Sequence, residues 1–142
     1  MFETPEKINE SSKKGDTYFN VADETQLLKS EIIWSLTTYS YEGNTFVLIP
    51  QKFDNSYYFT MVMLGSKQEC SKYMVKLEVH EQKLSSQDSE VSFNYRGNPC
   101  SIDEKKDEFK YFGLTINNRA MERMLRKRED LEFGMSFTFY NK

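Results

Sequence analysis

The side chains that most often carry catalysis are scarce in this sequence. Among 142 residues it has one histidine, His80, and two cysteines, Cys70 and Cys100. A serine or cysteine nucleophile normally needs a positioned base, most often histidine. His80 lies beside Glu78 and Glu81 at the end of an expected strand, which favours a partly exposed strand-end residue over a catalytic base. We therefore expect no catalytic residue in this domain.

The sequence offers equally little for a metal or phosphate site. Two cysteines and one histidine cannot supply the four ligands of a structural zinc ion, so we expect no metal and no cofactor. The six glycines occur singly and form no phosphate-binding loop. A disulfide between Cys70 and Cys100 stays open, but the polar N-terminus lacks a secretory signal, which favours two reduced thiols. We expect a cytoplasmic protein, with the nucleus as an alternative location.

Charged residues occur in runs of mixed sign. The spacing within 103–108 leaves a glycosidase carboxylate pair open, but such runs are more typical of a solvated loop. The basic stretch from Arg119 to Arg128 is interrupted by Glu122, which favours a solvated helix face over contact with an acidic partner or nucleic acid. The net charge is −3, and no run approaches the roughly 20 apolar residues that span a bilayer. We expect neither a nucleic-acid nor a membrane partner.

Short aromatic and apolar runs separated by turn signals dominate the rest of the chain. Aromatic residues make up 15% of the sequence, and they favour strands because they pack well on pleated surfaces. A short edge segment or loop is expected at 99–104. The runs predict a mainly β protein, an antiparallel β-sandwich of about seven or eight strands. The expected strands cover 17–22, 31–39, 45–49, 57–64, 70–79, 91–95 and 131–140.

One short helix is expected near residues 117–127. Asn117 is a good N-cap, and four apolar side chains recur at helical spacing: Ala120, Met121, Met124 and Leu125. We expect this helix to lie across an end or edge of the sandwich. Residues 1–15 are polar and are interpreted as a tail or linker, and 16–142 as the folded domain.

Two features indicate binding. Trp34 is the only tryptophan, and in a continuous strand Trp34 and Leu36 would face one way while Ile33 and Ser35 face the other. Such a tryptophan is either a core residue or an interface anchor. The first strand, 17–22, follows the polar tail and is a candidate sheet edge, open to pairing with a peptide.

The order of several segments resembles the C-terminal substrate-binding domain of the seven-in-absentia ubiquitin ligases, which has a TRAF-like β-sandwich. The likeness runs over residues 16–140. The matching segments are Asp16-Thr-Tyr-Phe-Asn-Val-Ala-Asp23, Trp34 followed by Gly43 and Phe46, Tyr58-Phe-Thr-Met-Val-Met-Leu-Gly65 with Tyr73-Met-Val-Lys-Leu-Glu78, Pro99-Cys-Ser-Ile-Asp-Glu104, and Phe133-Gly-Met-Ser-Phe-Thr138.

The resemblance implies that an extended peptide, often with a Val-x-Pro core, pairs with the first strand, and that the sandwich forms a homodimer. Trp34 and Leu36 would form the pocket floor. Two positions depart from the family. Ala22 occupies a position where the family has threonine, and Ser136 occupies a position where it has an asparagine that contacts the peptide. The implied peptide-binding residues are Phe19, Val21, Ala22, Asp23, Trp34, Leu36 and Ser136.

The leading hypothesis is therefore a protein-interaction domain that recognises extended segments of substrates or partners for a seven-in-absentia-type ubiquitin ligase. The domain itself would not catalyse ubiquitination, and the RING domain of a ligase is not among these 142 residues. On this hypothesis Trp34→Ala weakens peptide binding by about 2 kcal/mol or more without unfolding the domain. The alternatives are a non-catalytic TRAF-like scaffold or oligomerisation domain and, third, a carbohydrate-binding sandwich.

Overall fold

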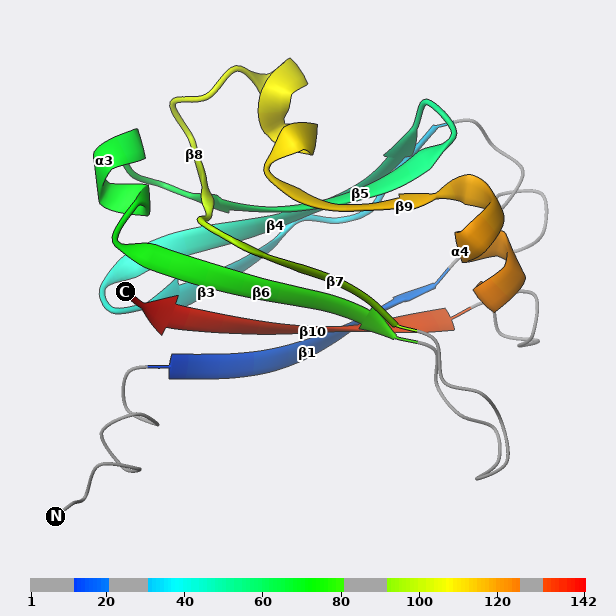
Figure 1. Ribbon diagram of the computed structural model, residues 1–142, viewed down its shortest axis with the longest axis horizontal. Helices are drawn as coiled ribbons and strands as arrows, with labels where there is room; N and C mark the ends of the chain where they lie inside the picture. The colour runs from blue at the N-terminus through cyan, green and yellow to red at the C-terminus, as the bar shows by residue number, and fades with distance from the viewer. Residues whose placement is uncertain (1–11, 21–30, 81–91, 126–131) are drawn as a thin grey trace, which may run out of the picture.

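Two β-sheets face each other in the computed structural model, which describes residues 12–20, 31–80, 92–125 and 132–142 (Figure 1). In chain order the elements are β1 (Ser12–Asn20), β2 (Ile32–Ile33), β3 (Thr37–Tyr41), β4 (Asn44–Phe53), β5 (Ser56–Met63), α3 (Lys67–Cys70), β6 (Tyr73–His80), β7 (Ser92–Gly97), β8 (Cys100–Ser101), the 3-10 helix η1 (Lys106–Tyr111), β9 (Gly113–Asn117), α4 (Asn118–Leu125) and β10 (Glu132–Asn141).

The first sheet has the strand order β1-β10-β6-β7, and all its described pairs are antiparallel. Strands β6 and β10 alternate as the sequence predicts, because every second side chain points into the space between the sheets. The inward side chains are Val75, Leu77, Val79, Phe133, Met135, Phe137 and Phe139, all buried. This alternation fixes the register, since a slip of one residue would turn the apolar set toward water.

The second sheet is built around the β4–β5 hairpin. Its order is β2-β4-β5-β8, with β3 also paired to β4 and β9 also paired to β5. The pair of β5 with the two-residue β8 is parallel, whereas its other pairs are antiparallel. The turn of this hairpin has two residues in the left-handed region, with φ of 50° at Asp54 and 61° at Asn55. Asp and Asn tolerate this conformation better than most residues.

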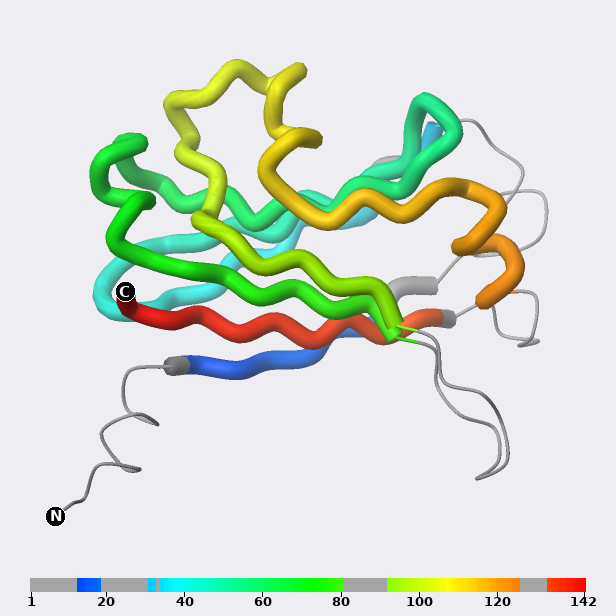
Figure 2. The backbone as a smooth tube through the Cα atoms, in the orientation of Figure 1, coloured from blue at the N-terminus to red at the C-terminus, as the bar shows by residue number. Residues whose placement is uncertain are grey.

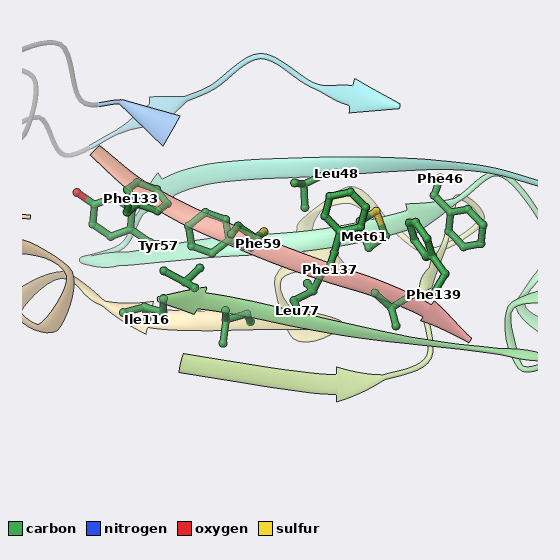
Figure 3. Close-up of a cluster of buried hydrophobic side chains, with 14 of the residues drawn as sticks. Phe46, Leu48, Tyr57, Phe59, Met61, Leu77, Ile116, Phe133, Phe137 and Phe139 are labelled. Carbon is green, nitrogen blue, oxygen red and sulfur yellow. The ribbon is translucent and has the colours of Figure 1, made fainter. Parts of the chain in front are cut away.

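Aromatic side chains from both sheets fill the core between them (Figure 3). Phe46 and Phe139 come from opposite sheets, and their ring centroids lie 4.5 Å apart. Phe59 and Phe133 meet edge to face at 5.8 Å. Such pairs stabilise a core beyond the area that they bury. The mainly β sandwich predicted from the sequence is confirmed, and eight of its ten described strands have five or more residues.

The predicted helix is present as α4, and three of its four expected apolar residues are buried, namely Met121, Met124 and Leu125. The Ala120 N–H donates to Asn117 Oδ1 at 2.8 Å, which is the expected N-cap. Within the described residues, no helix combines the length and apolar character needed to cross a bilayer.

Replacing Asn117 by alanine removes this cap and leaves the Ala120 N–H without its side-chain acceptor. We expect Asn117→Ala to lower the free energy of unfolding by about 1 kcal/mol, because cap deletions cost roughly that much. Urea denaturation measures the change. Asn117→Asp keeps a carboxyl oxygen at the same place and should be nearly neutral, so an equal loss in both variants would contradict the capping role.

Four parts of the fold differ from the sequence-based expectation. The predicted strand 31–39 is interrupted, because residues 34–36 lie outside β2 and β3. Strand β1 begins at Ser12, inside the segment interpreted as a polar tail, because residues 12–15 pair with 137–140 of β10. Strand β9 and the one-turn helix α3 were not expected, since both are too short to show a clear period.

Candidate functional site

Strand β1 forms one edge of the first sheet. It pairs with β10 along its whole length, from Ser12 opposite Tyr140 to Asn20 opposite Glu132. Among the described residues, no strand pairs with its other side, and Figure 2 shows its blue tube outermost, next to the red tube of β10. In an antiparallel pair, every second residue directs its N–H and C=O away from the neighbour. A nine-residue row of backbone groups therefore alternates between β10 and the open side.

The other edges of the two sheets are less accessible to an added strand. Strand β7 packs alongside β9 of the other sheet. Strand β3 has five residues, strand β2 has two, and β9 leads directly into α4. Short or covered edges are the usual means by which proteins avoid pairing with other chains. Strand β1 is therefore the edge best suited to accept an added strand.

The outer face of β1 presents polar and aromatic side chains. Lys14, Asp16 and Tyr18 are exposed, and 62% of Tyr18 is accessible to solvent. The intervening Gly15 and Thr17 are partly buried. A side chain at Gly15 would collide with the Phe137 ring, so this position needs glycine for a close approach.

A chain of polar side chains crosses the outer face from β1 to β6. The Ser136 hydroxyl donates to Asp16 Oδ1 at 2.7 Å, and His80 Nε2 lies 3.2 Å from Ser136 Oγ. Because the single hydroxyl hydrogen of Ser136 is directed to Asp16, His80 Nε2 is the donor in the second bond. The ring of Tyr18 lies next to this chain, within 3.2 Å of where a side chain at Gly134 would begin.

These residue types match those of a serine hydrolase, but their order does not. In a hydrolase the histidine lies between the serine and the acid and accepts the serine proton. Here Ser136 lies between Asp16 and His80, so its proton is held by the carboxylate and is not transferred to a base. An open hollow of about 490 Å³ adjoins them, lined by Glu78, His80, Ser92 and Ser136. The arrangement is suited to hydrogen bonding with a ligand.

Two hydrogen bonds join β1 to β3 of the second sheet. Lys13 Nζ donates to the backbone oxygen of Ser40 at 2.6 Å. The side chains of Thr17 and Tyr39 are hydrogen-bonded, and the Tyr39 ring centroid lies 4.3 Å from that of Phe137. Strand β1 is thus held by contacts to the second sheet as well as by β10, which keeps its open edge in place for a partner.

Trp34 lies in the interrupted segment between β2 and β3, partly buried against the core. Its ring stacks on Tyr57 at 5.9 Å and meets Phe133 edge to face at 6.2 Å. Phe133 is the partner of Phe19 in the β1–β10 register, so Trp34 lies near the C-terminal end of β1. Leu36 is 57% exposed, so it does not share the buried position that a continuous strand would give both residues.

Because Trp34 packs on the core, its replacement affects stability. We expect Trp34→Ala to lower the free energy of unfolding by about 1–2 kcal/mol, since each aromatic contact contributes about 0.5–1.5 kcal/mol. Thermal or urea unfolding measures this, with Leu36→Ala as a control at an exposed neighbour. An unchanged unfolding curve for Trp34→Ala would mean that the ring contributes nothing to the core.

The expected peptide-binding residues do not all lie together in the structure. Phe19 lies on β1, but its side chain is not described, and Val21, Ala22 and Asp23 lie outside the described residues. Ser136 faces the outer surface of the first sheet, whereas Trp34 packs on the inner side, so the two do not line one pocket. A strand added to β1 would direct alternate side chains toward each of these sides.

Sequence reasoning missed the contribution of His80 and Asp16 to this surface. Ser136 is 56 residues from His80 and 120 from Asp16 in the chain, so only the strand register brings them together. The alternation of β10 places Ser136 on the outer face, and that signal was present in the sequence. The sequence carried no signal that β10 pairs between β1 and β6.

The two cysteines lie away from this edge, and both are unpaired and buried. Burial raises the pKa of the Cys100 thiol from 9.0 to about 12, and it also raises the pKa of Cys70. Thiolate is the reactive form of cysteine, so this environment disfavours nucleophilic chemistry. Within the described residues, no three histidine, cysteine, aspartate or glutamate side chains group closely enough to hold a metal ion.

The raised pKa of Cys100 predicts sensitivity to alkali. An unfolded thiol ionises near 9 and the folded one near 12, so the stability from keeping the thiol neutral is complete below pH 9 and is lost as the pH rises toward 12. We expect Cys100→Ala to make the free energy of unfolding fall less steeply between pH 9 and 11. Urea denaturation in a reducing buffer tests this, and identical slopes for both proteins would contradict it.

No protein-family model matches this sequence, and no curated protein matches it either. The likeness to the seven-in-absentia domains therefore stays a prediction from the sequence.

Proposed function

We propose that this domain binds extended segments of partner proteins by adding them as a strand to the open side of β1. The observation that carries this proposal is the nine-residue edge strand, which pairs only with β10 in the described part of the chain. Main-chain hydrogen bonds to such an edge give affinity, and the side chains on either face give specificity.

The surroundings of the edge supply contacts on both faces of an added strand. The outer face offers Tyr18 with the Asp16–Ser136 pair, which are aromatic and polar groups suited to an interface. Near the end of β1, the inner side offers the partly buried Trp34, which contacts Phe133. The partner's backbone would therefore bind along the edge while its alternate side chains contact each set.

The sequence resemblance suggests which partners the domain binds and for what purpose. The domain would select substrates for a seven-in-absentia-type ubiquitin ligase, in the cytoplasm or the nucleus, and its ligands would include Val-x-Pro segments. Strand addition uses backbone groups and needs no cofactor. The side chains that meet the ligand would differ from those of the family at Ala22 and Ser136.

Titration of the domain with a panel of Val-x-Pro peptides tests this proposal, with Trp34 fluorescence as the signal because it is the only tryptophan. We expect saturable binding. For any peptide that binds, methylating the backbone nitrogens of one alternate set should abolish binding, whereas methylating the other set should not, because only one set faces β1. Equal effects of both sets would contradict strand addition, and silence of the whole panel would remove the Val-x-Pro form.

A non-catalytic scaffold that self-associates is the second candidate, because an open edge can also pair with another copy of the chain. Light scattering separates the two functions. A stable dimer that binds no peptide would favour the scaffold, and a peptide-binding monomer would favour the recognition domain.

A further inference from the structure

We propose that the segment accepted by β1 carries an aromatic, a basic and an acidic residue at alternate positions, in that order from its N-terminus. This inference rests on the proposed function and names the ligand class of the same edge. The three positions would lie opposite Tyr18, Asp16 and Lys14, which are all exposed on β1.

The charge pattern follows from the geometry of neighbouring strands. Lys14 and Asp16 are two residues apart, so both project from the outer face of the sheet. A residue directly opposite on an added strand has its Cβ about 4.5–5.5 Å away, where opposite charges attract and like charges repel. An acidic residue is thus favoured opposite Lys14, and a basic residue opposite Asp16.

Asp16 and Tyr18 are also held in place before a ligand arrives. The carboxylate of Asp16 accepts the Ser136 hydroxyl at 2.7 Å, and Ser136 is itself held by His80 at 3.2 Å. The Tyr18 ring lies over Gly134, where the absence of a side chain gives it room. Groups that are already oriented lose less conformational freedom on binding, which raises affinity and specificity.

The order of the ligand residues depends on its direction. Antiparallel pairs are slightly more stable than parallel ones and are more common, and β1 already pairs antiparallel with β10. An antiparallel ligand reaches Tyr18 first, then Asp16, then Lys14. Its sequence therefore reads aromatic-x-basic-x-acidic.

A second copy of the chain fits this edge less well than such a ligand. Antiparallel pairing of two β1 strands can set Lys14 opposite Asp16 of the other copy, because the pattern is self-complementary. In that register Tyr18 lies opposite Ser12, so its exposed ring gains no aromatic partner. A ligand of different sequence can satisfy all three positions at once.

Two designed peptides test the pattern: Thr-Thr-Tyr-Thr-Lys-Thr-Glu-Thr-Thr and the same peptide with lysine and glutamate exchanged. We expect the first to bind about tenfold more tightly at low salt, because two attractive pairs replace two repulsive ones. The preference should shrink as salt is added, since exposed charges are screened. Calorimetry or Trp34 fluorescence measures both affinities.

Exchanging the charges on the protein supplies the decisive variant. The double variant Lys14→Glu with Asp16→Lys should reverse the preference between the two peptides. The matched control exchanges Lys105 and Asp107, which are also exposed and two residues apart, but lie at η1, away from β1. This control should leave the tenfold preference unchanged.

Each outcome has one meaning. Equal binding of both peptides overturns the charge pattern while strand addition stands, and a preference for the exchanged peptide overturns the antiparallel order. Failure of every peptide, including the Val-x-Pro panel, removes the proposed function itself. A concentration-dependent dimer that Lys14→Glu dissociates would assign the pattern to a second copy and overturn the proposal.

Discussion

Replacing Phe133 by alanine is expected to lower the free energy of unfolding by about 3–5 kcal/mol, the usual cost of truncating a buried phenylalanine. Phe133 is 2% exposed and meets Phe59 and Trp34 edge to face at 5.8 and 6.2 Å. Its partner in the register is Phe19 at the end of β1. The variant should therefore loosen the core and the end of the edge strand together.

Urea denaturation measures this loss, and Tyr111→Ala is the matched control. Tyr111 is 72% exposed, so removing its ring should change the free energy of unfolding by less than about 0.5 kcal/mol. If Phe133→Ala were as stable as the control, Phe133 would not be the buried link between the two sheets that its contacts indicate.

Replacing Tyr18 by alanine is expected to weaken peptide binding by about 2 kcal/mol, which is roughly thirtyfold in Kd. The Tyr18 ring is 62% exposed on the open edge strand, so it has surface left to bury against a ligand. Its cross-strand contact with Gly134 contributes at most about 1 kcal/mol to folding, so the variant should remain folded.

Titration of Tyr18→Ala with a peptide that binds the parent domain gives the result. Tyr111→Ala again serves as the control, because it removes an exposed tyrosine from η1, away from β1. Parent-like affinity in Tyr18→Ala, or an equal loss in both variants, would show that the ligand does not lie along the outer face of β1.

The strands with regular alternation are the part of the fold that the sequence predicts well. In β6 and β10, inward apolar residues such as Val75, Leu77, Phe137 and Phe139 recur at every second position. A sheet with one face in the core requires this period, so both the strands and their inward faces can be assigned. The helix α4 was equally clear, because Asn117 caps it and its apolar face has helical spacing.

The edges of the sheets were predicted less well, since their sequences carry weaker signals. Residues 12–15 are polar because an edge strand is open to water on two sides. Their composition therefore resembles that of a polar tail. The segment around Trp34 has strand-like composition, yet its ring packs on Tyr57 from an irregular backbone. Tertiary packing determines the conformation there, and local propensity does not.

The candidate site was predicted only in part for the same reason. The open first strand followed from its position beside a polar segment, and the described part of β1 does lie at an edge. The polar chain through Asp16, Ser136 and His80 depends on β10 lying between β1 and β6. No local sequence pattern specifies that order of strands. The hydrogen bonds among these three side chains can therefore be predicted only once the long-range strand pairing is known.

Amide hydrogen exchange over residues 12–20, with and without a saturating peptide, tests strand addition most directly. If the peptide adds to β1, exchange should slow at alternate residues, those whose N–H groups point away from β10, while the amides bonded to β10 change little. Peptide binding that saturates without slowing exchange anywhere in β1 would contradict strand addition at this edge.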